Sequence, residues 1–496
     1  MNAQLAATQP AAVQPAAARP ALLDVARLVH SIRYEDLPAE VVQRAKALLL
    51  DTLACACGGA ASGTSHKVLQ VVQELGGSHQ ASVIGSGLKT SMPMAALANG
   101  TMVRYMDAND YYFGRDPAHP SGNIATLLAV GEKHGTSGKE FIACMVAAYE
   151  LQIRLCDAAG EPSLWSRGWH HSTNAVFAAS ALSARMMGCS EEATAHAMAI
   201  AASHQNTLAA LQSGEVSQIK STAEAWAGKA GIEAAMLAVA GITGPLHLLE
   251  AKNGWADAVA GKLDVQRLTA PVDGHYKLMQ ACTKPYPAVA SAMAVIEAGI
   301  ALRAQLGLDS HLSNELAGLQ RIVVSLPAYV LGTPAASAGR RHPATKESAE
   351  HSLYFCAALA LHAGECTESD FGRANLDSPL MALLLDRIEL AEDAELSQGW
   401  PARAGAAVSI TLADGRTLTH RCPAPPGHPD NPMSAQALAD KFNRHASGLF
   451  TAPQRERLRA LVASLEDVGD VGELGAALSS TGAEHNLART IHVEHH

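Results

Sequence analysis

Apolar residues recur at intervals of three and four along most of the chain from residue 22 to 275, which is the spacing of one face of a helix. One such run begins after Pro38 and ends at Gly58, because proline suits the first turn of a helix and glycine suits its end. The sequence from Ser137 to Glu140 has the pattern of a capping box, and Ser190 precedes two acids in the first turn of another run. The pattern therefore predicts a large all-α domain over residues 22–275.

Beyond residue 276 the apolar positions alternate instead. Ile322, Val324 and Leu326 recur with a period of two, as in a half-buried strand. A second alternating stretch, AAVSITLADGRTLTHRC, contains the turn signal Asp414-Gly415 and reads as a β-hairpin. We therefore expect a smaller α+β lid domain over residues 276–425. The amphipathic segment 426–466 is predicted to return to the helical domain, so the fold class is mainly α with an inserted lid.

The two ends of the chain differ from the rest. Residues 1–21 are rich in Ala, Pro and Gln and have no basic region followed by an apolar core, so we predict a disordered tail without a signal peptide. Residues 467–496 are predicted to be weakly ordered. The apolar stretch from Ala234 stops at Gly244, well short of the roughly 20 residues that a membrane-spanning helix needs. The sequence thus predicts a soluble protein with no membrane partner.

The amino-acid composition limits the classes of partner and the cellular compartment that we expect for the protein. The formal net charge is −10 and no run of Lys or Arg forms a basic stripe, so no nucleic-acid partner is expected. Only 4% of residues are aromatic, which favours close-packed helices. Nine cysteines cannot all pair, and Cys55-Ala-Cys57 lacks the spacing of a zinc site, so we predict reduced thiols and a cytoplasmic location.

The first concentration of polar residues is MDANDYYFGRDPAHPSGN, residues 106–123, directly before an apolar run. Loops at helix junctions can hold acids, bases and anion-binding groups together, with the amides of the next helix as further donors. Its candidate site residues are Asp107, Tyr111, Arg115 and His119. A purely solvated loop, in which His119 simply precedes Pro120, is the alternative.

The second concentration is SRGWHHSTNAV, where His170 and His171 precede an apolar helix. Adjacent side chains cannot share one helix face, so we expect at most one of the two histidines to reach a given site, and no two-histidine metal site. A histidine that caps the helix or is satisfied in the core is the alternative.

Four cations form the third group: Lys220, Lys284, Arg340 and Arg341. Lys220 and Lys284 lie among small or apolar neighbours, where an unpaired ammonium is costly, so each needs a partner or a ligand carboxylate. A structural ion pair would explain either lysine alone. Several such cations on an acidic chain fit a pocket for a small polycarboxylate.

Taken together these motifs resemble the MmgE/PrpD family, which includes 2-methylcitrate dehydratase, cis-aconitate decarboxylase and iminodisuccinate epimerase. The resemblance runs in order from about residue 23 to 462. It rests on the segments YMDANDYY, HPSGN, RGWHH, the helix with Lys220, GITGP, KPYPA, PATKESAEHSLYF and GRANLDSPLMALLLDRIEL. It implies a helical domain built from both ends of the chain, an inserted lid, a cleft between them, and a homodimer. It also implies no metal, nucleotide or iron–sulfur cofactor.

The resemblance also implies roles for individual residues. Asp107, His119 and one of His170 and His171 correspond to the family's catalytic positions, and Lys220 and Lys284 correspond to its carboxylate-binding lysines. The shared chemistry removes a proton or a carboxylate next to other carboxylates. A hydro-lyase like 2-methylcitrate dehydratase is the first expectation. The alternatives are a decarboxylase, an epimerase and a carboxylate-binding member without activity.

Three positions depart from the family pattern. Ala108 stands where the family has an aromatic residue, and Tyr111 stands where it has Thr or Ser. The KPYP segment continues as AVASAM, where the family continues into a histidine. Losing that histidine removes a candidate acid or base, so we expect a changed substrate and a possible change of reaction within the family.

Overall fold

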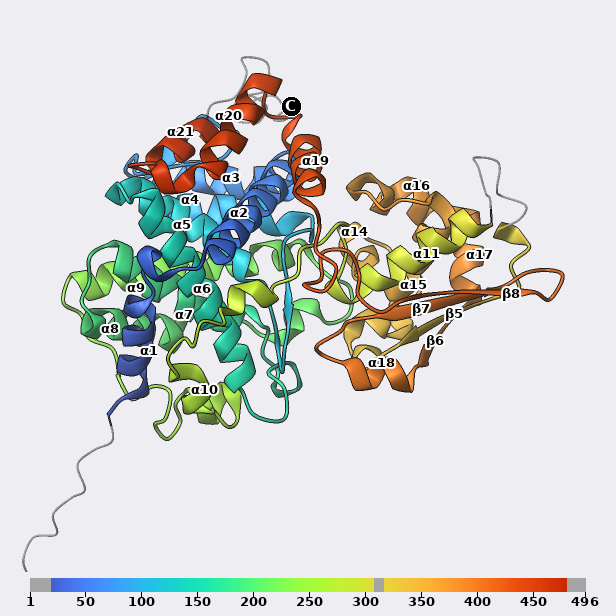
Figure 1. Ribbon diagram of the computed structural model, residues 1–496, viewed down its shortest axis with the longest axis horizontal. Helices are drawn as coiled ribbons and strands as arrows, with labels where there is room; N and C mark the ends of the chain where they lie inside the picture. The colour runs from blue at the N-terminus through green and yellow to red at the C-terminus, as the bar shows by residue number, and fades with distance from the viewer. Residues whose placement is uncertain (1–18, 307–315, 480–496) are drawn as a thin grey trace, which may run out of the picture.

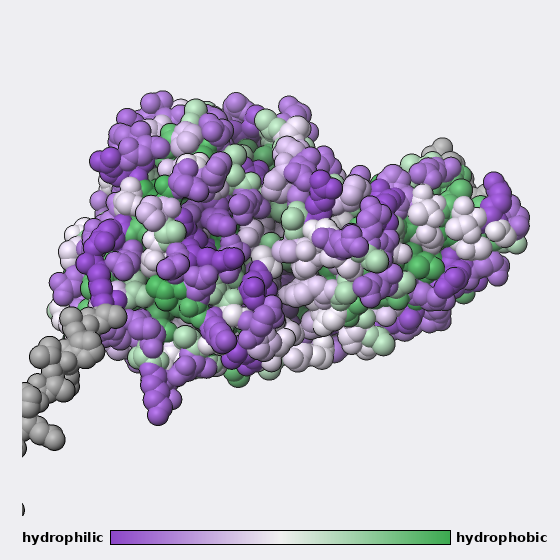
Figure 2. All heavy atoms as spheres, turned by 60° about the horizontal axis from the view of Figure 1, so that its bottom comes forward, coloured by the Kyte–Doolittle hydropathy of each residue, from purple (hydrophilic) through white to green (hydrophobic). Residues whose placement is uncertain are grey.

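The computed structural model describes residues 19–306 and 316–479. It consists of a large helical body and a smaller lid with a four-stranded sheet (Figure 1). Figure 2 shows the two parts as unequal lobes, with hydrophilic residues covering most of the face in view. The predicted fold class, mainly α with a smaller α+β part, is confirmed.

The first part of the body contains ten helices in the described residues. The longest are α2, α6 and α9, and α9 packs against both α4 and α7. The helices are α1 (Ala21–Ser31), α2 (Ala39–Ala60), α3 (Gly63–Leu75), α4 (Met92–Tyr105), α5 (Ile124–His134), α6 (Gly138–Ala158), α7 (Ser172–Met186), α8 (Glu191–His204), α9 (Ala223–Val239) and α10 (Val265–Thr269). Two short hairpins lie between them, β1 (Ala81–Ser82) with β2 (Lys89–Thr90) and β3 (Tyr112–Phe113) with β4 (Pro117–Ala118).

Local signals place the helix starts. The Ser137 hydroxyl accepts a hydrogen bond from the amide of Glu140, and the Ser190 hydroxyl accepts one from the amide of Ala193, so both predicted N-caps are confirmed. Gly59 allows a close approach of α2 and α4, because a Cβ there would lie 2.0 Å from the carbonyl oxygen of Met102. Small residues therefore set how tightly these helices pack.

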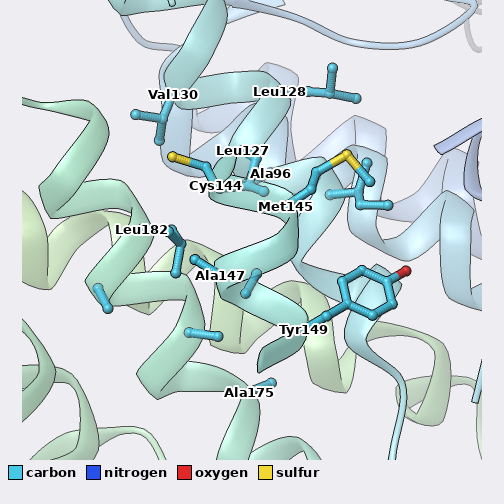
Figure 3. Close-up of a cluster of buried hydrophobic side chains, with 14 of the residues drawn as sticks. Ala96, Leu127, Leu128, Val130, Cys144, Met145, Ala147, Tyr149, Ala175 and Leu182 are labelled. Atoms are coloured by element: carbon cyan, nitrogen blue, oxygen red, sulfur yellow. The ribbon is translucent and has the colours of Figure 1, made fainter. Parts of the chain in front are cut away.

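Figure 3 shows the same principle inside the body. Short side chains such as Ala96, Ala147 and Ala175 belong to the same buried cluster as larger ones such as Leu127 and Met145. With so few aromatic residues, the core is filled by aliphatic side chains and by helices that approach one another closely.

The lid is built on one mixed sheet of order β6-β5-β7-β8. β5 pairs in parallel with β6 and antiparallel with β7, and β7 forms a hairpin with β8. Ile322, Val324 and Leu326 are buried as the alternation predicted, and Gly415 has a φ of +85° in the predicted turn. The strands are β5 (Arg321–Leu326), β6 (Ile388–Glu392), β7 (Ala406–Thr411) and β8 (Thr417–Cys422).

Helices pack against this sheet and connect its strands. The apolar helix α15 packs against α11, and α11 also contacts β7 and β8. The lid helices are α11 (Met293–Gln305), α13 (Ala328–Leu331), α14 (Lys346–Ala349), α15 (Leu353–Ala363), α16 (Arg373–Leu376), α17 (Pro379–Arg387) and α18 (Ala394–Gly399).

The chain then returns to the body through α19 (Ala435–Ala446), α20 (Ala452–Ala463) and α21 (Gly472–Ser479). The prediction of weak order from residue 467 onward was wrong for residues 467–479. Leu474 and Leu478 of α21 are buried, and α21 packs against α5 and β1. The remainder of that predicted tail, residues 480–496, and most of the predicted N-terminal tail, residues 1–18, lie outside the described residues.

Two separate clusters of buried apolar residues mark the two parts. The first cluster contains residues between Ala21 and Ala281 and between Phe442 and Leu478. The second cluster contains residues between Cys282 and Cys422, together with Tyr111. Among the described helices, none alone has the length and hydropathy to span a membrane, and α2 with α3 meets these criteria only as a pair bent by 86°.

Candidate active site

A cavity of about 380 Å³ lies where the body meets the lid. The body contributes polar side chains from α4, from the loop after it and from the start of α7. The lid contributes residues from the segments around α11, α13 and α14. The polar residues on its wall include Arg104, Asp107, His119, His171, Gln212, Arg340 and His351.

The loop after α4 folds so that Asp107 and His119 reach this wall together. Asp107 has a φ of +50°, a left-handed conformation that aspartate tolerates better than most residues. The hairpin of β3 and β4 then brings the chain back, and the carbonyl oxygen of Asp110 lies 2.6 Å from Nδ1 of His119. The Asp110 carboxylate is itself fixed by the hydroxyl of Tyr149 at 2.5 Å and by the amide of Ser121 at 3.1 Å.

His119 is held as a neutral base. A carbonyl oxygen can only accept a hydrogen bond, so Nδ1 carries the proton and Nε2 keeps its lone pair. Burial lowers the pKa of His119 well below 6.5, and the nearby charge of Arg104 lowers it further. The imidazole is therefore unprotonated at neutral pH and able to take a proton.

His171, rather than His170, lines the cavity. The His171 ring lies 4.9 Å from the His119 ring and 3.8 Å from the His170 ring, measured between centroids. His170 points to other partners, with Nδ1 2.9 Å from the Ser172 hydroxyl. Burial lowers the pKa of His171 to about 3, so it too is neutral.

Asp107 is the centre of a buried charge cluster. Its Oδ1 lies 3.1 Å from Nζ of Lys220 and 3.4 Å from Nζ of Lys284, and its Oδ2 lies 3.5 Å from Nε2 of His351. Burial by itself would raise the pKa of Asp107, but the charges of Lys220 and Lys284 outweigh it and hold the pKa well below 3.8. Asp107 is thus ionised and neutralised by its neighbours.

Lys220 and Lys284 lie behind Asp107 and do not line the cavity. Both are almost completely buried, and Nζ of Lys284 also donates to the carbonyl oxygens of Asp107 and Ala288. Lys220 contacts Glu350 at 3.4 Å as well. The structural ion pair, which the sequence left as an alternative, describes the observed contacts of both lysines. Their role in binding a substrate stays a prediction.

Two arginines supply the cationic groups on the cavity wall. Arg340, predicted from the sequence, donates to the carbonyl oxygen of His351 at 3.3 Å. Arg104 was missed, although it lies one helical turn before Asp107 and forms an ion pair with it at 3.2 Å. Its Nε also lies 2.8 Å from Oε2 of Glu224.

Glu224 is an unexpected acid in the site. Its Oε1 lies 3.4 Å from Nε2 of His171, and its side chain is buried. Burial raises the pKa of Glu224 to about 7, although the charge of Arg104 opposes this shift. Glu224 follows Lys220 by four residues, and His351 belongs to the segment PATKESAEHSLYF, so both lie close in sequence to predicted site residues.

Besides His170, Lys220 and Lys284, three further candidates from the sequence do not line the cavity. Arg115 forms an exposed ion pair with Glu161 at 2.8 Å. Arg341 donates to backbone carbonyl oxygens of the lid at Leu385 and Ile388. Tyr111 is buried beneath the cluster, with its ring centroid 6.0 Å from Nζ of Lys284. Their predicted contacts with a substrate stay predictions that the cavity lining does not favour.

The departure after the KPYP segment falls on the cavity wall itself. Val289, Ala290 and Ser291 line the cavity at the positions where the sequence resemblance led us to look for a histidine. By contrast, Ala108 is buried against Cys55 and Met106, away from the cavity.

Comparison with known families divides the chain between residues 268 and 286, close to the point where the body passes into the lid. The profile of the MmgE/PrpD N-terminal domain matches residues 23–268, and the profile of the MmgE/PrpD C-terminal domain matches residues 286–467. The chain belongs to the MmgE/PrpD family. The family resemblance indicated by the sequence motifs is thereby confirmed.

Two activities occur among the MmgE/PrpD relatives. The human cis-aconitate decarboxylase is 27% identical over 469 residues, which cover 91% of this chain and 93% of the relative. The 2-methylcitrate dehydratase of Cupriavidus necator is 26% identical over 464 residues, which cover 90% of this chain and 93% of the relative. The mitochondrial 2-methylcitrate dehydratase of Yarrowia lipolytica is 26% identical over 472 residues, covering 90% and 87%.

Within the described residues, no group of three or more His, Cys, Asp or Glu side chains has the geometry to hold a metal ion.

Proposed function

We propose that this protein is a lyase that removes a proton next to a carboxylate of a small di- or tricarboxylate, in the manner of a 2-methylcitrate dehydratase. The observation that carries the proposal is the position of His119, a neutral imidazole on the wall of a cavity that also presents Arg104 and Arg340. A base beside two guanidinium groups suits a carbon acid flanked by carboxylates.

Binding uses the two arginines. Nη2 of Arg104 can donate to one carboxylate, because Nε and Nη1 already bond Glu224, Asp107 and Asn109. The guanidinium group of Arg340 can donate to a second carboxylate. Arg104 and Arg340 come from the body and the lid respectively, so a substrate with two carboxylates bridges the two parts. This places the carbon between the carboxylates near His119.

In the chemical step, Nε2 of His119 takes the proton from the carbon next to a carboxylate. The negative charge that develops on the substrate is stabilised by the two guanidinium groups. Lys220 and Lys284 neutralise Asp107 and fix its position, so that its charge opposes this stabilisation less. In this mechanism Asp107 is a positioning residue for Arg104 and His351.

A second group must protonate the departing hydroxyl. His171 lies on the cavity wall, and Glu224 behind it has a pKa raised to about 7 by burial. Glu224 therefore carries a proton in a large fraction of molecules at neutral pH and lies 3.4 Å from Nε2 of His171. We assign the acid role to this pair, with His171 nearer the substrate.

Decarboxylation of a cis-aconitate-like substrate is the second candidate. It is favoured by the similarity to cis-aconitate decarboxylases over nine-tenths of the chain. The same residues would serve it, because loss of carbon dioxide leaves a carbanion that needs stabilising cations and a proton donor such as the Glu224–His171 pair. Epimerisation would instead return a proton to the same carbon.

One experiment separates these reactions. The protein is incubated in D2O with single di- and tricarboxylates, including 2-methylcitrate and cis-aconitate, and each mixture is followed by proton NMR. Dehydration gives new alkene signals, and decarboxylation replaces the substrate signals by those of a product with one carboxyl group fewer, with carbon dioxide measured in the gas phase. Epimerisation exchanges one proton for deuterium and leaves the carbon skeleton unchanged. Binding without any of these changes, or no binding at all, would contradict the proposal.

A further inference from the structure

Beside its polar groups, the cavity has a wall of aromatic rings. Phe113 from the β3 hairpin, Tyr329 from α13 and Trp400 after α18 all line it. The Phe113 and Trp400 rings lie 4.7 Å apart, and the Tyr329 and Trp400 rings are stacked at 4.9 Å with an interplanar angle of 18°. We call these three residues the aromatic wall.

The aromatic wall is unusual for this chain. Only 4% of its residues are aromatic, yet three of them meet at one cavity, and Trp165 lines the same space. None of the three is fully buried, and Tyr329 keeps 39% of its surface exposed. Aromatic rings that stay partly exposed around a cavity usually mark a surface that a ligand covers.

The cavity lining combines apolar and polar residues. Val330 and Pro334 of the lid line the cavity together with Tyr329, and Arg104, His119 and His171 line it as well. Val289 and Ala290 add further apolar surface. A volume of about 380 Å³ falls in the range of pockets for drug-sized ligands and exceeds what a six-carbon tricarboxylate needs.

We propose that the natural substrate carries, beside its carboxylates, a bulky apolar substituent of about the size of a phenyl ring, which packs against the aromatic wall. This inference rests on the proposed function, because it uses Arg104 and Arg340 as the carboxylate-binding end. It names the substrate class more narrowly: an amphiphilic di- or tricarboxylate.

The physical reason is the free-energy cost of leaving apolar surface exposed to water. A substrate without an apolar substituent would leave the rings of the aromatic wall in contact with water, and the bound state would gain nothing from them. A phenyl-sized group removes both its own surface and that of the rings from water. Stacking on Trp400 or Tyr329 would add a directional contribution.

The test compares three dicarboxylate probes by calorimetry on the full-length protein: succinate, methylsuccinate and benzylsuccinate. We expect benzylsuccinate to bind at least 10-fold more tightly than methylsuccinate. Tyr329→Ala, which alters an exposed side chain and should not disturb folding, is expected to remove most of this difference and leave the affinity for methylsuccinate within about twofold. Trp400→Phe, which keeps an aromatic ring, should retain more of the difference in affinity between benzylsuccinate and methylsuccinate.

Two controls make the outcomes distinct. Trp226→Ala changes an exposed aromatic residue on α9, outside the cavity lining, and should leave all three affinities unchanged. Arg340→Ala should weaken all three probes alike. If the probes bind through Arg340 but the benzyl group brings no gain, the aromatic substituent is refuted while the proposed function stands. If Arg340→Ala leaves binding unchanged, the carboxylate site itself is wrong.

Discussion

Asp107 and Lys220 form an ion pair of 3.1 Å in which both side chains are buried. They come from different segments of the body, the loop after α4 and the segment before α9, so the pair exists only in the folded protein. Because Asp107 also contacts Arg104 and His351, this pair links the charge cluster to the cavity wall.

Removing Lys220 should therefore damage stability as well as activity. In Lys220→Met the Asp107 charge loses its shortest ion pair, and breaking a buried pair on one side costs about 3–5 kcal/mol. We expect a clear fall in the thermal unfolding midpoint, measured by calorimetry. The same substitution at the exposed Lys252 should leave the midpoint nearly unchanged. Equal midpoints for the two variants would refute the structural role of Lys220.

Replacing each histidine by asparagine should separate their roles. His119→Asn and His171→Asn remove groups on the cavity wall, and losing an acid or base commonly costs 10²–10⁴-fold in rate. His170→Asn is the matched control, because His170 is buried beside His171 but does not line the cavity. We expect less than a tenfold loss there, measured as kcat with folding checked by circular dichroism. A larger loss of kcat in His170→Asn than in His171→Asn would overturn the assignment of His171 to the site.

The dependence of kcat on pH should report the protonation of Glu224. Its pKa is raised to about 7 by burial, so the carboxyl is protonated below that pH and ionised above it. If the protonated form supplies the acid, kcat should fall as pH rises through about 7. His119, with a pKa well below 6.5, should cause no acid limb near neutrality. Glu224→Gln should lower kcat and abolish the alkaline limb; a limb that persists in this variant would exclude Glu224.

The neighbouring arginines should differ sharply. Arg340 lines the cavity, whereas Arg341 bonds backbone carbonyl groups inside the lid. Arg340→Ala should raise KM at least 10-fold, because a carboxylate loses its guanidinium partner. Arg341→Ala should leave KM within about threefold and lower the unfolding midpoint. Steady-state kinetics and thermal unfolding on both variants check this, and a larger KM effect at Arg341 would contradict the site geometry.

The homodimer expected from the family resemblance remains a prediction, and α9 offers a face for it. Among the described residues, five of the eleven large apolar side chains that are exposed fall between Trp226 and Ile242. We expect Leu237→Glu to convert a dimer into monomers in light scattering. Leu75→Glu, at an exposed site on α3, should not. A wild-type monomer, or a dimer unaffected by Leu237→Glu, would contradict this prediction.

Local signals predicted much of the fold. The caps at Ser137 and Ser190, the alternation of β5 and the hairpin turn at Gly415 depend on residues close together in the chain, and the structure confirms them. The helix α21 was missed because its burial depends on contacts with α5 and β1, which a local pattern does not reveal.

The site was only partly predictable for the same reason. The crowded segment 106–123 did bring Asp107 and His119 to the cavity, but Arg115, at the tip of the small hairpin between β3 and β4, faces away from it. Lys220 and Lys284 needed buried partners, as their apolar neighbours indicated, and found them in Asp107. The sequence does not reveal the roles of Arg104, Glu224 and His351, because these roles depend on contacts between residues that are far apart in the chain.

In the proposed reaction the imidazoles that move protons come from the body, whereas Tyr329 and Trp400, two of the three residues of the aromatic wall, come from the inserted lid. Proton transfer and most of the proposed contact with the substituent would thus be encoded in different stretches of the gene. Substitutions in the lid can change which side group is accepted while the proton-transfer apparatus stays intact. Such a division allows one ancestral reaction to be redirected toward new acids by exchange or drift of the insert alone.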